Sequence, residues 1–147
     1  MTQVTRTLQH PIDEVFAVLV DPWTYPDWLV GAKEMRSVDA TWPVPGASFH
    51  HRVGLGGPLS IADSSTCLEV VTPNRLVLEV RARPAGRGKV TFRLTSPTPA
   101  TTEVAFAEEP LGAARLLTPV AAPLAVLRNH RSLQHLERYL AEGAAQT

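Results

Sequence analysis

The chain has 147 residues, 44% of them hydrophobic and 19% charged, and its 14 basic and 14 acidic side chains leave no net charge at pH 7. This length fits a single domain over residues 1–147, and the charge balance argues against nucleic acid as a partner. Cys67 is the one cysteine, which excludes an internal disulfide and a cysteine-based metal cluster. Because no apolar run approaches about 18 residues and no apolar leader is present, we expect a cytoplasmic protein without integral membrane association.

The first predicted elements are a strand and a helix. Polar and apolar residues alternate over residues 4–8, which is typical of a strand with one buried face. Pro11 then stands where a helix can begin, and apolar residues at helical spacing continue until Pro22 ends the pattern. We therefore expect a short helix between these two prolines.

An aromatic segment, "DPWTYPDWLVG" at residues 21–31, follows this helix. Its two prolines exclude a long helix, and the segment is too short and interrupted for a core strand. We interpret it as a tight corner, with one or two short helices, that caps one end of an internal cavity.

The part of the chain after this corner, up to residue 109, is strand-like and is broken at short intervals by turns rich in proline and glycine. We predict six strands, within "KEMRSVDA", "SFHHRVGL", "LSIADSSTCLEVV", "RLVLEVRAR", "KVTFRLT" and "TTEVAFAEE". Strands at these spacings are typical of an antiparallel meander.

The end of the chain changes to a helical period. The positions Val126, Asn129, Leu133, Leu136 and Leu140 follow one another at intervals of three or four, which places them on one face of a long helix. Residues 111–123 contain two prolines and form either a kinked first part of this helix or a separate lead-in. Residues 141–147 are expected to be a frayed tail.

These elements predict an α+β fold in which a curved antiparallel sheet wraps around the long C-terminal helix. A sheet of this size must bury one face, and the long helix is the only predicted element able to cover it. The order is strand, one or two short helices, six strands and the long helix.

Several segments of the chain resemble the START-like superfamily of helix-grip folds, and most of all its bacterial polyketide cyclase/dehydrase and lipid-transport branch. They are "VTRTLQHPIDEVFAVLVDPWTYPDW", "GASFHHRV", "LEVVTPNRLVLEV", "TTEVAFAEEP" and "RNHRSLQHLERYL", and together they span nearly the whole sequence. The resemblance implies a deep, mostly apolar pocket between sheet and helix that holds a lipid, a sterol-like molecule or an aromatic polyketide-like molecule. It supplies no catalytic signature that can be carried over residue by residue.

Candidate ligand-binding residues come from the aromatic corner, the inward strand faces and the helix stripe. Their alternative role is core packing, since aromatic rings in a cap serve either purpose. Asn129 interrupts the apolar stripe, and a buried amide without a partner costs about 1–3 kcal/mol, so it must bond to the protein, to water or to a ligand. The candidates are Trp23, Tyr25, Trp28, Trp42, Phe49, His51, Leu78, Phe92, Phe106, Val126, Asn129, His130 and Leu133.

Three residues are weak candidates for acid–base chemistry: Glu108, His51 and His130. Alternation places Glu108 on the inward face of its strand, where burial would raise its pKa. The alternative is a carboxylate at the strand end, in solvent or paired with an arginine such as Arg115. For His51 and His130, the alternative to acid–base chemistry is a structural role.

Other patterns are weaker indications of function. His50 and His51 are adjacent on a strand and point to opposite faces, so we expect no metal site, and no cofactor is indicated. Asp63 lies among serines and threonines, but no nucleophile turn accompanies it. The glycine-rich "GLGGP" at residues 54–58 precedes no helix and is not expected to bind phosphate. Residues 75–93 hold six cations and one acid, and form either a solvated face or a contact for phosphate or an acidic partner.

Two functions remain open. The chain either binds a hydrophobic small molecule in its cavity, with or without cyclase-type or dehydrase-type chemistry, or it is a non-catalytic interaction module that resembles the co-chaperone-like ATPase activators of the superfamily. We expect a monomer or a homodimer, because the sheet has edges open to pairing.

Overall fold

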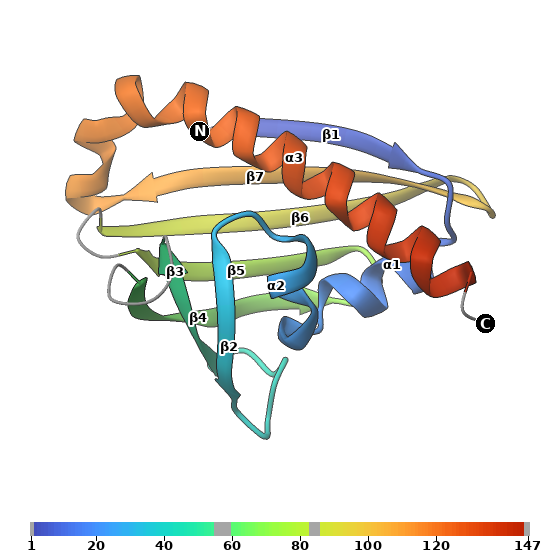
Figure 1. The fold of residues 1–147 in the computed structure, drawn as a ribbon, viewed down its shortest axis with the longest axis horizontal. Helices are drawn as coiled ribbons and strands as arrows, with labels where there is room; N and C mark the ends of the chain where they lie inside the picture. The colour runs from blue at the N-terminus through green and yellow to red at the C-terminus, as the bar shows by residue number, and fades with distance from the viewer. Residues whose placement is uncertain (1, 55–59, 83–85, 146–147) are drawn as a thin grey trace.

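A computed structural model describes residues 2–54, 60–82 and 86–145, and Figure 1 shows its course. The elements, in chain order, are β1 (Thr2–Leu8), α1 (Ile12–Leu19), η1 (Pro22–Thr24), α2 (Tyr25–Trp28), β2 (Ala32–Val38), β3 (Ser48–Gly54), β4 (Ser60–Val71), β5 (Arg75–Ala82), β6 (Gly86–Thr98), β7 (Thr101–Leu111), η3 (Gly112–Leu117) and α3 (Thr118–Ala145). Most of the "GLGGP" segment, residues 55–58, lies outside the described part of the chain.

The seven strands form one antiparallel sheet in the order β1-β7-β6-β5-β4-β3-β2. The predicted meander is confirmed, because each strand from β2 to β6 pairs with the next strand along the chain. The first strand joins the opposite edge by pairing with β7. The pairing register shifts within β2–β3, β4–β5 and β6–β7, and such bulges bend strands and increase their twist.

The long helix α3 crosses one face of this curved sheet diagonally (Figure 1). Its stripe of Leu133, Leu136 and Leu140 is buried, as the helical spacing predicts. The inward strand positions, such as Val104 and Phe106 of β7, complete the core. This arrangement confirms the α+β helix-grip architecture.

The two ends of α3 can be compared with the helix bounds expected from the sequence. The 3-10 helix η3 precedes it, and Pro123 lies within α3, so both a separate lead-in and a proline inside the helix are present. At its other end the helix continues through residues 141–145, where a frayed tail was expected. Leu140 is buried and residues 141–143 are exposed, so the helix extends past its last packed leucine.

The aromatic corner folds around the end of α1. The hydroxyl of Tyr25 donates to the carbonyl of Leu19 at 2.7 Å, and the indole Nε1 of Trp42 donates to the carbonyl of Val20 at 2.8 Å. A helix leaves its last carbonyls without intrahelical partners, and these aromatic side chains supply the missing donors. Tyr25 in the corner and Trp42 outside it therefore both cap the end of α1.

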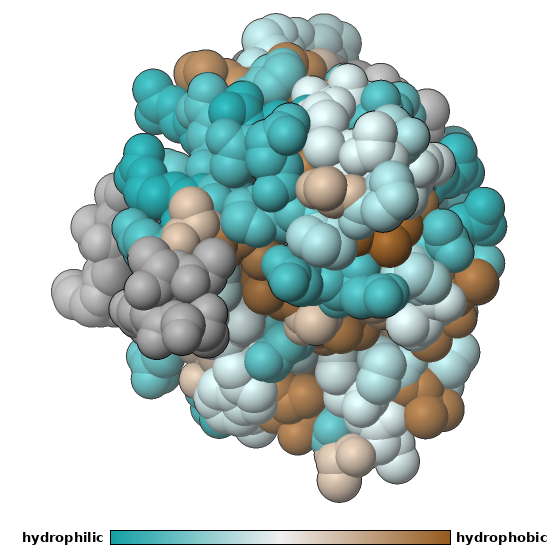
Figure 2. Space-filling view, turned by 90° about the vertical axis from the view of Figure 1, so that its right-hand side faces the viewer, coloured by the Kyte–Doolittle hydropathy of each residue, from teal (hydrophilic) through white to brown (hydrophobic). Residues whose placement is uncertain are grey.

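Figure 2 shows the end of the molecule at which α1 and the last turns of α3 lie. There the hydrophobic residues form small groups between hydrophilic ones. Three exposed leucines lie on η3 and the first half of α3: Leu116, Leu124 and Leu127. No helix in the described residues is both long and apolar enough to span a membrane.

Candidate functional site

A cavity of about 350 Å³ lies between the inner face of the sheet, the segment that joins α2 to β2, and α3. It forms because α3 packs mainly along β1 and α2, while the lining comes largely from the middle strands of the sheet. Most of its wall is apolar, and its lining includes Tyr25, Leu29, Met35, Phe49, Leu78, Val80, Val90, Phe92 and Phe106.

Aromatic rings form two parts of this wall. Tyr25 and Phe49 meet edge to face, with ring centroids 5.5 Å apart and planes at 73°. Phe92 and Phe106, on the neighbouring strands β6 and β7, have centroids 4.5 Å apart. Such pairs hold each other in fixed orientations, so the wall presents rigid rings to whatever enters.

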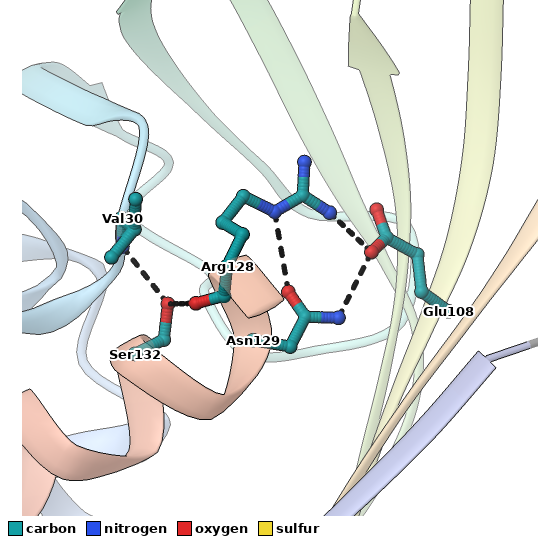
Figure 3. A network of polar contacts seen from close by, with 5 residues as sticks. All are labelled: Val30, Glu108, Arg128, Asn129 and Ser132. Carbon is teal, nitrogen blue, oxygen red and sulfur yellow. Dashed lines mark hydrogen bonds and ion pairs between the residues drawn. The ribbon is translucent and has the colours of Figure 1, made fainter. Parts of the chain in front are cut away.

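A polar cluster interrupts the apolar wall where α3 faces β7 (Figure 3). Asn129 Nδ2 donates to Glu108 Oε2 at 3.0 Å, and Asn129 Oδ1 accepts from Arg128 Nε at 3.2 Å. Arg128 Nη2 donates to the same Glu108 oxygen. Only 1% of Asn129 is exposed, and this cluster satisfies its amide without a ligand.

The same turn of α3 also holds the segment between α2 and β2. Ser132 Oγ donates to the carbonyl of Arg128 at 3.1 Å and accepts the backbone N–H of Val30 at 3.0 Å (Figure 3). Val30 and its neighbours Leu29, Gly31 and Ala32 line the cavity. Because Gly31 has φ +98°, a backbone region that favours glycine, the tight path of this segment depends on that residue.

A second polar position lies on β3 and β4. His51 Nε2 is 3.3 Å from Ser65 Oγ, and both residues line the cavity. Burial lowers the pKa of His51 from its ordinary 6.5, and the Asp63 carboxylate on the neighbouring strand offsets part of this effect. His51 is therefore neutral at pH 7, and its Nδ1 is buried without a hydrogen bond to any described residue.

The chemical capacity of the site follows from these two positions. The carboxylate of Glu108 is held in an ion pair with Arg128 and accepts hydrogen bonds. Neutral His51 can accept or donate a hydrogen bond through its ring nitrogens. The described residues hold no group of three or more His, Cys, Asp or Glu able to bind a metal ion.

Eight of the residues singled out in the sequence line this one cavity. They come from the aromatic corner, four strands (β3, β5, β6 and β7) and the helix, and alternation along the strands explains why they meet. They are Tyr25, Phe49, His51, Leu78, Phe92, Phe106, Glu108 and Asn129.

The structure places the other six candidates outside the lining. Trp28 and Leu133 are fully buried core residues, and Trp28 packs its ring against Tyr25 and Phe92. Trp42 packs against Phe49 behind the wall. The remaining three do not reach the cavity, because two are exposed and one is half-buried at the helix margin: Trp23, His130 and Val126.

Sequence reasoning did not single out several lining residues. Arg128 precedes Asn129 and was not identified, because it lies beside the apolar stripe rather than in it. Arg115, offered as a partner for Glu108, is not that partner; Arg128 is. Ser65 could have been found, since it alternates with Cys67 on an inward strand face. Leu29, Val30 and Gly31 belong to the aromatic segment that was expected to cap the cavity, but none of them was singled out by itself.

Three of the six cations in the basic stretch form salt bridges with carboxylates in the described part of the chain. Salt bridges join Arg75 to Glu69, Arg87 to Glu79 and Lys89 to Glu109. This pairing favours the solvated-face interpretation. Cys67 is buried, and burial raises the pKa of its thiol, which fits a packing role.

Comparison with known proteins gives a family and a fold. The model of the family described as "Activator of Hsp90 ATPase homolog 1-like protein" matches residues 9–141. No curated protein matches the chain. A solved structure from Rhodobacter sphaeroides is similar with a TM-score of 0.73 and 21% identity, and the match covers 95% of this chain and 91% of that one.

Two further solved structures share the fold. A protein from Nitrosomonas europaea has a TM-score of 0.72 and 21% identity, with 97% of this chain and 94% of that one covered. The di-domain ARO/CYC StfQ from the steffimycin biosynthetic pathway has a TM-score of 0.73 and 8% identity, with 98% of this chain and 51% of that one covered. At such identities the similarity establishes the helix-grip fold.

Proposed function

The chain belongs to the Activator of Hsp90 ATPase homolog 1-like family, and from its cavity we propose that it binds a hydrophobic, ring-containing small molecule between the sheet and α3. The observation that supports this most directly is the mostly apolar cavity of about 350 Å³ with a few polar side chains in its wall. Ligand sites in proteins have this composition, because apolar walls supply affinity and isolated polar groups fix orientation.

The size and shape of the wall favour rings over long chains. Ligand pockets span roughly 300–1,000 Å³, so this cavity lies near the small end of that range. The edge-to-face pair of Tyr25 with Phe49 and the tilted pair of Phe92 with Phe106 present ring faces and edges on which a flat ligand stacks. Of the three ligand classes expected from the sequence, an aromatic ligand therefore fits better than a sterol or a long acyl chain.

A second candidate function is a protein-interaction module. The family's description names an ATPase activator, and Leu116, Leu124 and Leu127 expose apolar surface on η3 and the first half of α3. Contiguous exposed apolar side chains often mark protein contacts. This function requires the exposed leucines and no bound ligand. Substitutions in the cavity and substitutions of these leucines therefore distinguish the interaction module from the ligand-binding protein.

The deciding experiment is a ligand titration on two matched variants. Val80→Phe adds a ring to a half-buried lining position, whereas Val71→Phe makes the same change at an exposed position of β4. Amide shifts of the wild type are followed with naphthalene, a fatty acid and a sterol as probes, and native mass spectrometry is used to look for a co-purified ligand.

The proposal expects saturable shifts with naphthalene at lining residues, weakened at least 10-fold by Val80→Phe and unchanged by Val71→Phe. Binding that is absent, or equally affected by both variants, would refute it. If no probe binds in the cavity, and if the wild type binds a partner protein that the variant Leu124→Asp does not bind, the interaction module would be supported instead.

A further inference from the structure

The ion pair in the cavity wall leaves two of its atoms unused. Arg128 uses Nη2 for Glu108 and Nε for Asn129, while Glu108 accepts both of its hydrogen bonds through Oε2. Arg128 Nη1 and Glu108 Oε1 bond to no residue that the structure describes. In Figure 3 these two atoms point to the same side, away from Asn129.

Both unused atoms are accessible. Glu108 and Arg128 line the cavity, and their side chains are 28% and 41% exposed. Asn129 is buried beneath them and fixes the pair from below, because it donates to the carboxylate and accepts from the guanidinium. The pair therefore presents one hydrogen-bond donor and one acceptor on the same side (Figure 3).

The charges of the pair decide which ligand group fits. A ligand carboxylate could accept from Arg128 Nη1, but its second oxygen would then face Glu108 Oε1, and the two negative groups would repel each other. A neutral group with an acceptor atom beside a donor atom bonds to both without repulsion. A primary carboxamide has this arrangement.

We propose that Glu108 and Arg128 are specificity-determining residues that select a neutral aromatic ligand with a carboxamide-type donor–acceptor group and disfavour aromatic carboxylates. This inference rests on the proposed binding function of the cavity. The ligand's carbonyl oxygen accepts from Arg128 Nη1, and its N–H donates to Glu108 Oε1. The ring system then lies against the aromatic wall.

The test compares three probes of one ring system at pH 7: naphthalene, 2-naphthamide and 2-naphthoate. In the wild type, calorimetry is expected to show 2-naphthamide binding at least 10-fold more tightly than the other two. Equal affinities for all three would overturn this inference and leave the proposed function intact. Binding of none would overturn both.

The variant Glu108→Gln sharpens the test by reversing the preference. Arg128 and Asn129 both donate to one side-chain oxygen, so the new amide must keep its oxygen there and place its NH₂ where Oε1 was. The site then presents two donors, and 2-naphthoate is expected to bind at least 10-fold more tightly than in the wild type, while 2-naphthamide weakens. Failure of the preference to reverse in a folded variant would contradict the proposal.

Two controls complete the design. Glu109→Gln makes the same chemical change at the neighbouring residue, whose carboxylate pairs with Lys89 and does not line this cavity, and is expected to change no affinity. Arg81 also borders the cavity and is exposed. If wild-type protein prefers 2-naphthoate and Arg81→Leu abolishes that preference, Arg81 is the selecting residue and the inference is wrong.

Discussion

Asn129 on α3 donates its side-chain amide to Glu108 on β7 at 3.0 Å, and this contact joins the long helix to the sheet it covers. The amide is almost fully buried, and its oxygen accepts from Arg128. One residue thus stabilises the helix position and shapes the polar part of the cavity wall.

Replacing Asn129 with leucine is expected to lower the free energy of unfolding by about 1–3 kcal/mol, because Glu108 loses one of its donors in a partly buried setting. Urea unfolding measures this change. Gln134→Leu, at an exposed position of the same helix, is the control and should change little. A neutral or stabilising effect of Asn129→Leu would mean that the amide contributes nothing to the fold.

Ser132→Ala removes the side-chain oxygen that accepts the Val30 N–H. We expect the Val30 amide to exchange its hydrogen several-fold faster, since a lost hydrogen bond of about 1 kcal/mol corresponds to a factor of roughly five. Exchange measured by NMR should show the effect at residues 29–32 and not in β6. Unchanged exchange at Val30 would show that the segment is held by its other contacts.

His51 should make the stability depend on pH. Burial lowers its pKa below the ordinary 6.5, so in acid the unfolded chain takes up a proton that the folded protein does not. The free energy of unfolding should therefore fall as the pH decreases below about 6.5, by at most about 1.4 kcal/mol per pH unit from this residue.

The variant His51→Gln isolates this contribution. The other histidines are present in both proteins, so the difference between the two pH profiles belongs to position 51. From pH 7.5 to 5, the urea midpoint of the wild type should fall relative to that of the variant as the pH decreases. Parallel profiles would show that His51 titrates alike in folded and unfolded chains.

Tyr25→Phe tests the cap at the end of α1. It deletes the hydroxyl that donates to the Leu19 carbonyl at 2.7 Å and leaves that carbonyl unpaired in the core. A loss of about 0.5–1.5 kcal/mol in unfolding free energy is expected. Tyr139→Phe, at a half-buried position on α3, serves as the control. If Tyr25→Phe and Tyr139→Phe change the unfolding free energy equally, the hydrogen bond from Tyr25 to the Leu19 carbonyl does not contribute specifically to stability.

The fold could be predicted from the sequence because its signals are local and repeated. Alternation marks the strands, and the spacing of Leu133, Leu136 and Leu140 marks the buried face of α3. The burial of a side chain was predicted less successfully where tertiary packing, and not the local sequence pattern, decides it. Trp23 and Trp28 lie in one short corner, yet the first is 55% exposed and the second is buried, and composition does not distinguish them.

The candidate site could be predicted only in part, for a related reason. Inward strand residues such as Phe49 and Phe106 follow from alternation, and both line the cavity. Arg128 does not follow from any period, because its long side chain reaches the wall from beside the apolar stripe. Its pairing with Glu108 depends on how a helix and a strand far apart in sequence are placed together.

The order of the sheet has a consequence for synthesis of the chain on the ribosome. β1 is synthesised before the other strands, but it pairs with β7, the last of them. Leu8 therefore has no pairing partner until Thr102 has been synthesised, and Thr2 has none until Glu108 has been. Until then β1 is an unpaired edge, and the inner face of the sheet lacks its helix. Contacts this distant in sequence slow folding and prolong the exposure of apolar strands. The growing chain is therefore most vulnerable to aggregation while its middle strands emerge, and the alternation of charged residues on their outer faces limits that risk.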